Sequence, residues 1–181
     1  MGVAADLGYA YRRPNGVQRA GQSLGSTTAG AWLFSKLLAP TDRVLFRWFK
    51  GRTSAPALLA GLPVMMVTTT GRKSGQPRTT PLIAVPVDDS LALIGTNFGQ
   101  RHTPAWVFNL EREPQVTVSY RDRRSELRAR PASDEERTAV WAAAAGIYGG
   151  YDKYQERIKG RAIRIFVLES ITESRTPEES G

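Results

Sequence analysis

The chain has 181 residues, of which 25 are lysine or arginine, 17 are aspartate or glutamate, one is histidine and none is cysteine, so its formal net charge is +8. This length suits a single domain with its own core. The lack of cysteine excludes disulfides, cysteine-ligated zinc, iron–sulfur clusters and thiol nucleophiles, and His102 alone excludes a site of several histidines, so no metal is expected. The positive charge favours an anionic partner.

The first 62 residues differ in character from the rest. Residues 1–28 are rich in glycine, serine and arginine without hydrophobic periodicity, which predicts a flexible extension. Helices are expected over residues 31–38 and 42–50, and we favour their packing onto the domain over contact with an anionic membrane surface. No membrane span or signal peptide is predicted, so a cytoplasmic location is expected, with a peripheral position at the inner face of the membrane through residues 31–50 as the alternative.

Strands are predicted from residue 64 onward, because short β-branched runs alternate with turns. Pro81 and Pro86 lack an N–H donor and place their strand at an edge or a bulge. Ser133 and Glu136 form a capping box at the start of a helix. The expected strands are 64–70, 78–87, 91–96, 115–120, 124–131 and 163–168, and the helices are 104–111, 133–145 and a short piece around Tyr154. This order predicts an α+β domain over residues 29–170 with a mostly antiparallel sheet, and a loose tail over 171–181.

The strongest local signal is the loop at residues 71–78, which reads GRKSGQPR. It holds three cations and a hydroxyl but no carboxylate, and its glycines allow a turn with exposed N–H groups. Such a loop suits a phosphate or several carboxylates, whereas a solvated hairpin tip is the alternative. It is not a P-loop, because Gln76 stands where that motif needs lysine.

Three weaker signals accompany this loop. The segment GTNFGQ at 95–100 leads into a helix that begins near Pro104, a corner that suits an anion or a ring. Three tyrosines recur at every third position after residue 147 and could line a flat substrate or simply pack. The remaining signal is an arginine cluster that would suit a nucleic-acid-binding module, although no such motif accompanies it: Arg121, Arg123, Arg124, Arg128 and Arg130.

The segment TTTGRKSGQPRTTPL at 68–82 resembles the signature of the deazaflavin-dependent nitroreductase family. The similarity continues through NFGQ at 97–100, PAW at 104–106, NL at 109–110, EER at 135–137 and the tyrosine segment, and it covers about residues 40–169. It implies a split β-barrel like those of flavin reductases and pyridoxamine-phosphate oxidases. It also implies coenzyme F-420, an 8-hydroxy-5-deazaflavin with a phosphate and an oligoglutamate tail.

The resemblance further implies a set of site residues. For the coenzyme these are Arg72, Lys73, Ser74, Gly75, Arg78, Pro81, Thr96, Asn97, Phe98, Gly99, Gln100, Arg101, Ala105, Trp106 and Asn109. The residues expected to border the substrate are Ile83, Val107, Tyr148, Tyr151 and Tyr154. Ile83 and Val107 depart from aromatic residues of other members, and Tyr148 or Tyr154 is the candidate proton donor, with water as the alternative.

The function expected from this resemblance is reduction of an electron-poor small molecule. The deazaflavin supplies a hydride from C5, and a quinone, an activated enone or a nitroaromatic accepts it. An FMN-dependent reductase of the same fold is the first alternative, and the nucleic-acid-binding module is the second. Both a monomer and a dimer are compatible with the sequence.

Overall fold

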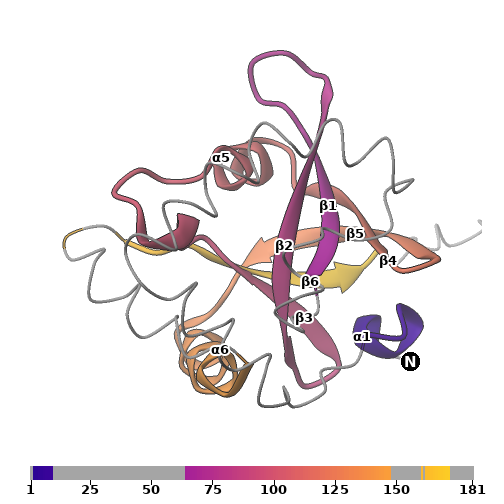
Figure 1. Cartoon of the computed structure of the whole chain (residues 1–181), viewed down its shortest axis with the longest axis vertical. Coiled ribbons are helices and arrows are strands. Elements are labelled where there is room, and N and C mark those ends of the chain that lie inside the picture. The colour runs from indigo at the N-terminus through magenta and orange to yellow at the C-terminus, as the bar shows by residue number, and fades with distance from the viewer. Residues whose placement is uncertain (1, 10–63, 148–159, 161, 172–181) are drawn as a thin grey trace, which may run out of the picture.

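The computed structural model describes residues 2–9, 64–147, 160 and 162–171. Six antiparallel strands of this part close into a barrel in the order β1-β2-β3-β6-β5-β4 (Figure 1). The strands are β1 (Val64–Thr70), β2 (Pro77–Val87), β3 (Ser90–Ile94), β4 (Gln115–Tyr120), β5 (Arg123–Pro131) and β6 (Ile165–Ser170). The helices are α1 (Val3–Asp6), the 3-10 turn η1 (Asn97–Gly99), α5 (Ala105–Arg112) and α6 (Asp134–Ile147). The predicted antiparallel α+β barrel is therefore confirmed.

The predicted elements agree with the observed ones to within about two residues at most boundaries. The last strand is placed correctly but begins at Ile165 rather than at residue 163. The capping box is present, because the Ser133 N–H donates to Glu136 Oε2 at 2.7 Å and the Glu136 N–H donates to Ser133 Oγ at 3.2 Å. The helices expected over 31–38, 42–50 and around Tyr154 lie outside the described residues.

The positions of Pro81 and Pro86 in β2 agree only in part with the prediction of an edge or a bulge. β2 belongs to a closed barrel, but each of its halves pairs on one side, residues 77–83 with β1 and residues 84–87 with β3. Pro81 stands opposite Met66 in the first half, and Pro86 stands opposite Leu91 in the second. A residue that pairs with a neighbouring strand on one side needs its N–H for at most one ladder of hydrogen bonds. Each half of β2 therefore tolerates proline as an edge strand does.

The core fills the barrel with side chains that alternate along the strands. Met65 and Val67 of β1 and Val116 and Val118 of β4 point inward, and Trp106 closes over them from α5. A second cluster lies on the outer side of the sheet, between the strands β2, β3 and β6 and the helix α6. Strand β3 is buried on both faces because it separates the two clusters.

Residues 2–9 differ from the prediction of a flexible extension over 1–28, because they are packed against the barrel. Val3, Leu7 and Tyr9 are buried in the barrel core, and the Tyr9 hydroxyl donates a hydrogen bond to the Ala84 carbonyl. The Tyr9 ring also lies 5.0 Å from the Tyr120 ring, measured between centroids. Three apolar residues separated by small ones are too few to show periodicity, so this segment was recognisable only from its contacts. Residues 10–28 lie outside the described part.

Candidate cofactor site

The basic loop joins β1 to β2 and adopts a tightly bonded turn. The Gly71 N–H donates to the Gln76 carbonyl at 2.9 Å, and the Gly75 N–H donates to the Gly71 carbonyl at 2.8 Å. The N–H groups of Ser74 and Gln76 are also bonded inside the loop, at 3.2 and 3.3 Å. The expectation that exposed N–H groups would bind an anion is therefore wrong for these residues. The side chains are what the loop offers, since Arg72, Lys73, Ser74 and Arg78 are all exposed.

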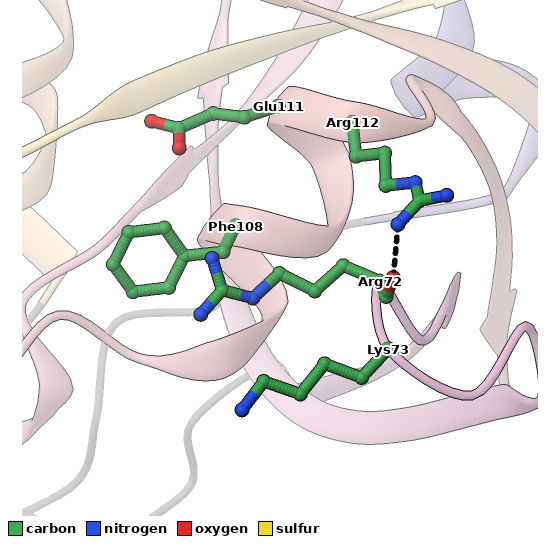
Figure 2. A pocket seen from close by; sticks show the side chains of 5 residues that line it. All are labelled: Arg72, Lys73, Phe108, Glu111 and Arg112. Atoms are coloured by element: carbon green, nitrogen blue, oxygen red, sulfur yellow. Dashed lines mark hydrogen bonds between the residues drawn. The ribbon is translucent and has the colours of Figure 1, made fainter.

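Helix α5 holds Arg72 at three points. The Arg72 N–H donates to Asn109 Oδ1 at 3.0 Å, and Arg112 donates to the Arg72 carbonyl. The Arg72 guanidinium carbon also lies 4.5 Å from the centre of the Phe108 ring, which is a cation–π distance. Both backbone groups and the side chain of Arg72 are therefore fixed by one helix, as Figure 2 shows for Phe108 and Arg112.

The Arg72 pocket is a cavity of about 570 Å³ lined by Arg72, Lys73, Phe108, Glu111 and Arg112 (Figure 2). Three of its lining residues are cations. Its carboxylate, Glu111, forms an ion pair with Arg164, whose guanidinium carbon lies 5.8 Å from the Phe108 ring centre. Since Arg164 neutralises Glu111, the cations of the pocket face the solvent with an excess of positive charge.

A second loop leads from β3 into α5. Thr96 is buried, and Asn97 has a positive φ of 51° that begins the turn η1. The Asn97 side chain donates to the His102 carbonyl at 3.1 Å and to Gln100 Oε1 at 3.4 Å, which holds the loop closed. Gly95 allows this loop to pass close to α5, because a Cβ there would lie 3.0 Å from Val107 Cγ2 and 3.1 Å from the Arg164 carbonyl oxygen.

The structure separates the remaining predicted residues into exposed and buried groups. Arg101 and Ala105 are exposed, Gly99 and Gln100 are half-buried, and Pro81 is half-buried on β2. Trp106 and Asn109 are buried at 5% exposure, where Trp106 packs edge-on against Phe166. Phe98 lies in η1, and the tyrosines 148, 151 and 154 lie outside the described residues.

Two residues predicted to border the substrate have packing roles in this structure. Val107 is 0% exposed in the barrel core, because it lies on the inward face of α5. Ile83 packs against the cluster beneath α6. Neither of them lines the Arg72 pocket, and their place at the substrate stays a prediction.

Sequence reasoning missed the residues that complete the pocket. Phe108, Glu111 and Arg112 share the outer face of α5 through their spacing of three and four residues, a signal that was available in the sequence. Arg164 gave no such signal, because it is close to α5 only through the pairing of β6 with β3.

The arginines of the cluster that suggested nucleic-acid binding make different contacts in the structure. Arg123 donates to the carbonyl of Asp6, the last residue of α1, at 2.9 Å. Arg130 forms ion pairs with Glu136 and Glu169, both at 2.6 Å, and Arg121 lies over the Tyr120 ring at 5.3 Å. These contacts give the nucleic-acid alternative no support from the described residues.

Two further properties concern the described residues alone. No three His, Cys, Asp or Glu side chains among them are grouped as a metal site would require. None of the helices in residues 2–9, 64–147 and 162–171 has the length and apolar character of a membrane-crossing helix.

Comparisons with known proteins agree on one family. The sequence model of the F420H2-dependent quinone reductases matches residues 43–170. An F420H2-dependent quinone reductase of Mycobacterium tuberculosis is 29% identical over 109 residues, which are 59% of this chain and 72% of that protein.

Two solved structures are similar in both fold and sequence. A reductase dependent on F420H2 has a TM-score of 0.54 at 34% identity, over 59% of this chain and 94% of its own. A domain-swapped dimer has a TM-score of 0.56 at 32% identity, over 72% of this chain and 100% of its own. The expected family, fold and enzyme class are confirmed: this chain belongs to the F420H2-dependent quinone reductase family.

Proposed function

We propose that this protein reduces quinones with the reduced form of coenzyme F-420 and that the Arg72 pocket holds the anionic tail of the coenzyme. The family match supports the reaction. The observation that supports the placement is the charge of the pocket, where Arg72, Lys73 and Arg112 surround a cavity whose carboxylate is already paired.

The residues present fit the chemistry of this coenzyme. A phosphate and several glutamates need a surface with many cations and few carboxylates, and residues 71–78 have three cations and no carboxylate. Because the N–H groups of Gly71, Ser74, Gly75 and Gln76 are bonded inside the loop, we expect the contacts to come chiefly from side chains, those of Arg72, Lys73, Ser74 and Arg78. Long flexible cations follow a chain of glutamates of variable length more easily than fixed backbone donors do.

The protein contributes binding, orientation and exclusion of water. The bound coenzyme supplies a hydride from C5 of its deazaflavin ring, and a quinone that gains this hydride and one proton becomes a hydroquinone. The loop over residues 96–101 and the exposed start of α5 at Ala105 are proposed to hold the ring. Tyr148 or Tyr154 is proposed to orient the acceptor or to donate the proton, with water as the alternative source. Activated enones and nitroaromatics are further acceptors that a quinone site of this kind could take.

Two proposals concern residues 31–50, which lie outside the described part. We expect them to pack onto the domain, and contact with an anionic membrane is the alternative. Flotation with anionic liposomes at low salt distinguishes the two, because only the membrane-bound form moves with the lipid.

The experiment for this proposal measures coenzyme binding by titrating the protein with F-420 and recording its fluorescence. Lys73→Ala and Arg78→Ala should each weaken binding by about 1.5–3 kcal/mol, the range for a hydrogen bond to a charged group. The loss should increase with the number of glutamates on the coenzyme. Arg128→Ala is the matched control, because it removes an exposed cation of β5 outside the pocket. Unchanged binding in both loop variants would place the tail elsewhere.

A further inference from the structure

We propose that Thr69 and Asn109 are positioning residues that fix the basic loop on α5 before the coenzyme binds and thereby set its affinity. The proposal rests on the proposed function, because it assigns an effect on the coenzyme to two residues that lie beneath the surface. It also changes the role of Asn109 from the direct coenzyme contact that the sequence suggested.

The two side chains form a continuous chain of hydrogen bonds under the loop. Asn109 Nδ2 donates to Thr69 Oγ1 at 2.9 Å, while Asn109 Oδ1 accepts the Arg72 N–H at 3.0 Å. Thr69 Oγ1 in turn donates to the Arg78 carbonyl at 3.4 Å. Both ends of the loop are therefore tied to each other and to α5 through two side chains.

Both side chains are buried, so we expect them to affect the coenzyme through the loop and not by direct contact. Thr69 is 2% exposed and Asn109 is 5% exposed, so neither offers a surface to a ligand in solution. A buried amide and a buried hydroxyl destabilise a core unless they are hydrogen-bonded, and apolar residues of similar size would fill the same space. Fixing one conformation of the loop is a contribution that those apolar residues could not make.

Two further contacts join α5 to the basic loop above Asn109. Together with the hydrogen bonds of Thr69 and Asn109 they form what we call the clamp. Arg112 donates to the Arg72 carbonyl, and Phe108 lies under the Arg72 guanidinium at 4.5 Å. The backbone of Lys73 follows directly, so its position depends on that of Arg72. A loop that is already ordered loses less conformational entropy when a ligand binds, and the gain appears in affinity rather than in turnover.

The test compares Thr69→Val with Thr69→Ser. Valine keeps the shape of threonine and removes the hydroxyl, whereas serine keeps the hydroxyl and removes the methyl group. We expect Thr69→Val to raise the Kd for coenzyme F-420 about threefold to tenfold, the equivalent of one lost hydrogen bond. Thr69→Ser should stay within about twofold of wild type, and kcat with a quinone should change by less than about twofold in both. Asn109→Ala supplies the same comparison if Thr69→Val does not fold.

A second step asks whether Thr69 acts through the two cations. In a background that carries Arg72→Ala and Lys73→Ala, Thr69→Val should have a smaller effect on the Kd than in the wild-type background, because Arg78 is then the one cation of the loop that Thr69 still positions. An undiminished effect in that background would overturn the proposal. Equal Kd values for Thr69→Val and Thr69→Ser would also overturn it, as would a lower Tm with an unchanged Kd. If Arg72→Ala and Lys73→Ala themselves leave the Kd unchanged, the placement of the tail fails instead.

Discussion

Leu7 provides a direct test of the role of the N-terminal segment. Its side chain is 1% exposed in the barrel core, beside Val3 and Tyr9. The segment closes the end of the barrel at which β2 turns into β3, because a Cβ on Gly2 would lie 2.4 Å from the Asp89 carbonyl oxygen. In Figure 1 α1 is accordingly remote from α5. We therefore expect Leu7→Ala to destabilise the fold and to leave the coenzyme site intact.

The size of the effect follows from the burial. Truncation of a fully buried leucine removes its apolar contacts and leaves a cavity, which together lower the free energy of unfolding by about 2–5 kcal/mol. For a chain of this size the Tm falls by about 2–4 °C for each kcal/mol. Tyr9→Phe should have a smaller effect, about 0.5–1.5 kcal/mol, because it removes one hydrogen bond to the Ala84 carbonyl but keeps the ring contact with Tyr120.

Urea unfolding followed by circular dichroism measures both variants, and Asp6→Asn is the control. Asp6 lies in the same segment but is exposed, so its substitution should change the free energy of unfolding by less than about 0.5 kcal/mol. Coenzyme affinity should remain at the wild-type value in all three proteins. If Leu7→Ala unfolds at the same urea concentration as wild type, the segment contributes nothing to the core and the original expectation of a loose extension is restored.

Three further predictions concern other parts of the chain. Gly95→Ala should lower the free energy of unfolding by about 1–3 kcal/mol in urea, because its Cβ would lie 3.0 Å from Val107 Cγ2, and equal stability would show that the loop relaxes freely. Hydrogen bonds from Arg130 lower the pKa of Glu136 from 4.5 to about 2, so the carboxylate stabilises the fold above about pH 4.5 and loses this effect as the pH falls toward 2. Glu136→Gln should therefore cost about 0.5–1 kcal/mol at pH 7, the range of a partly exposed pair, and a difference that persists at pH 2 would contradict this cause. Tyr154→Phe should lower quinone turnover with little change in coenzyme affinity, by about a hundredfold if the hydroxyl donates the proton, and unchanged turnover would remove it from the site.

The strands and the capping box were predictable because their signals are local. Val116, Val118 and Tyr120 alternate with polar residues, and this period specifies both the strand and its inward face. Ser133 and Glu136 bond each other across one turn, so their spacing alone identifies the start of α6.

The clamp under the basic loop was not predictable, because its partners are distant in sequence. Asn109 lies 40 residues from Thr69 and 37 residues from Arg72. A polar residue between Phe108 and Leu110 on an amphipathic helix is ordinarily assigned to the solvent face, and only the closed barrel shows that it points inward. The same limit explains Val107, since five apolar residues among the first six of α5 do not specify which of them face the core.

The two ends of the barrel carry different kinds of stabilisation, and this difference can be measured. Leu7 closes one end through apolar burial, so its truncation should lower the Tm and leave the Kd for the coenzyme unchanged. Thr69 orders the other end through hydrogen bonds, so its conversion to valine should raise the Kd, and it should also lower the Tm because the buried Asn109 Nδ2 loses its acceptor. Strand β2 connects the two regions, from the basic loop at Pro77 to the turn at Asp88 that follows Val87. If the barrel transmitted strain between its ends, Leu7→Ala would also raise the Kd for the coenzyme, whereas independent ends predict that only Thr69→Val raises it.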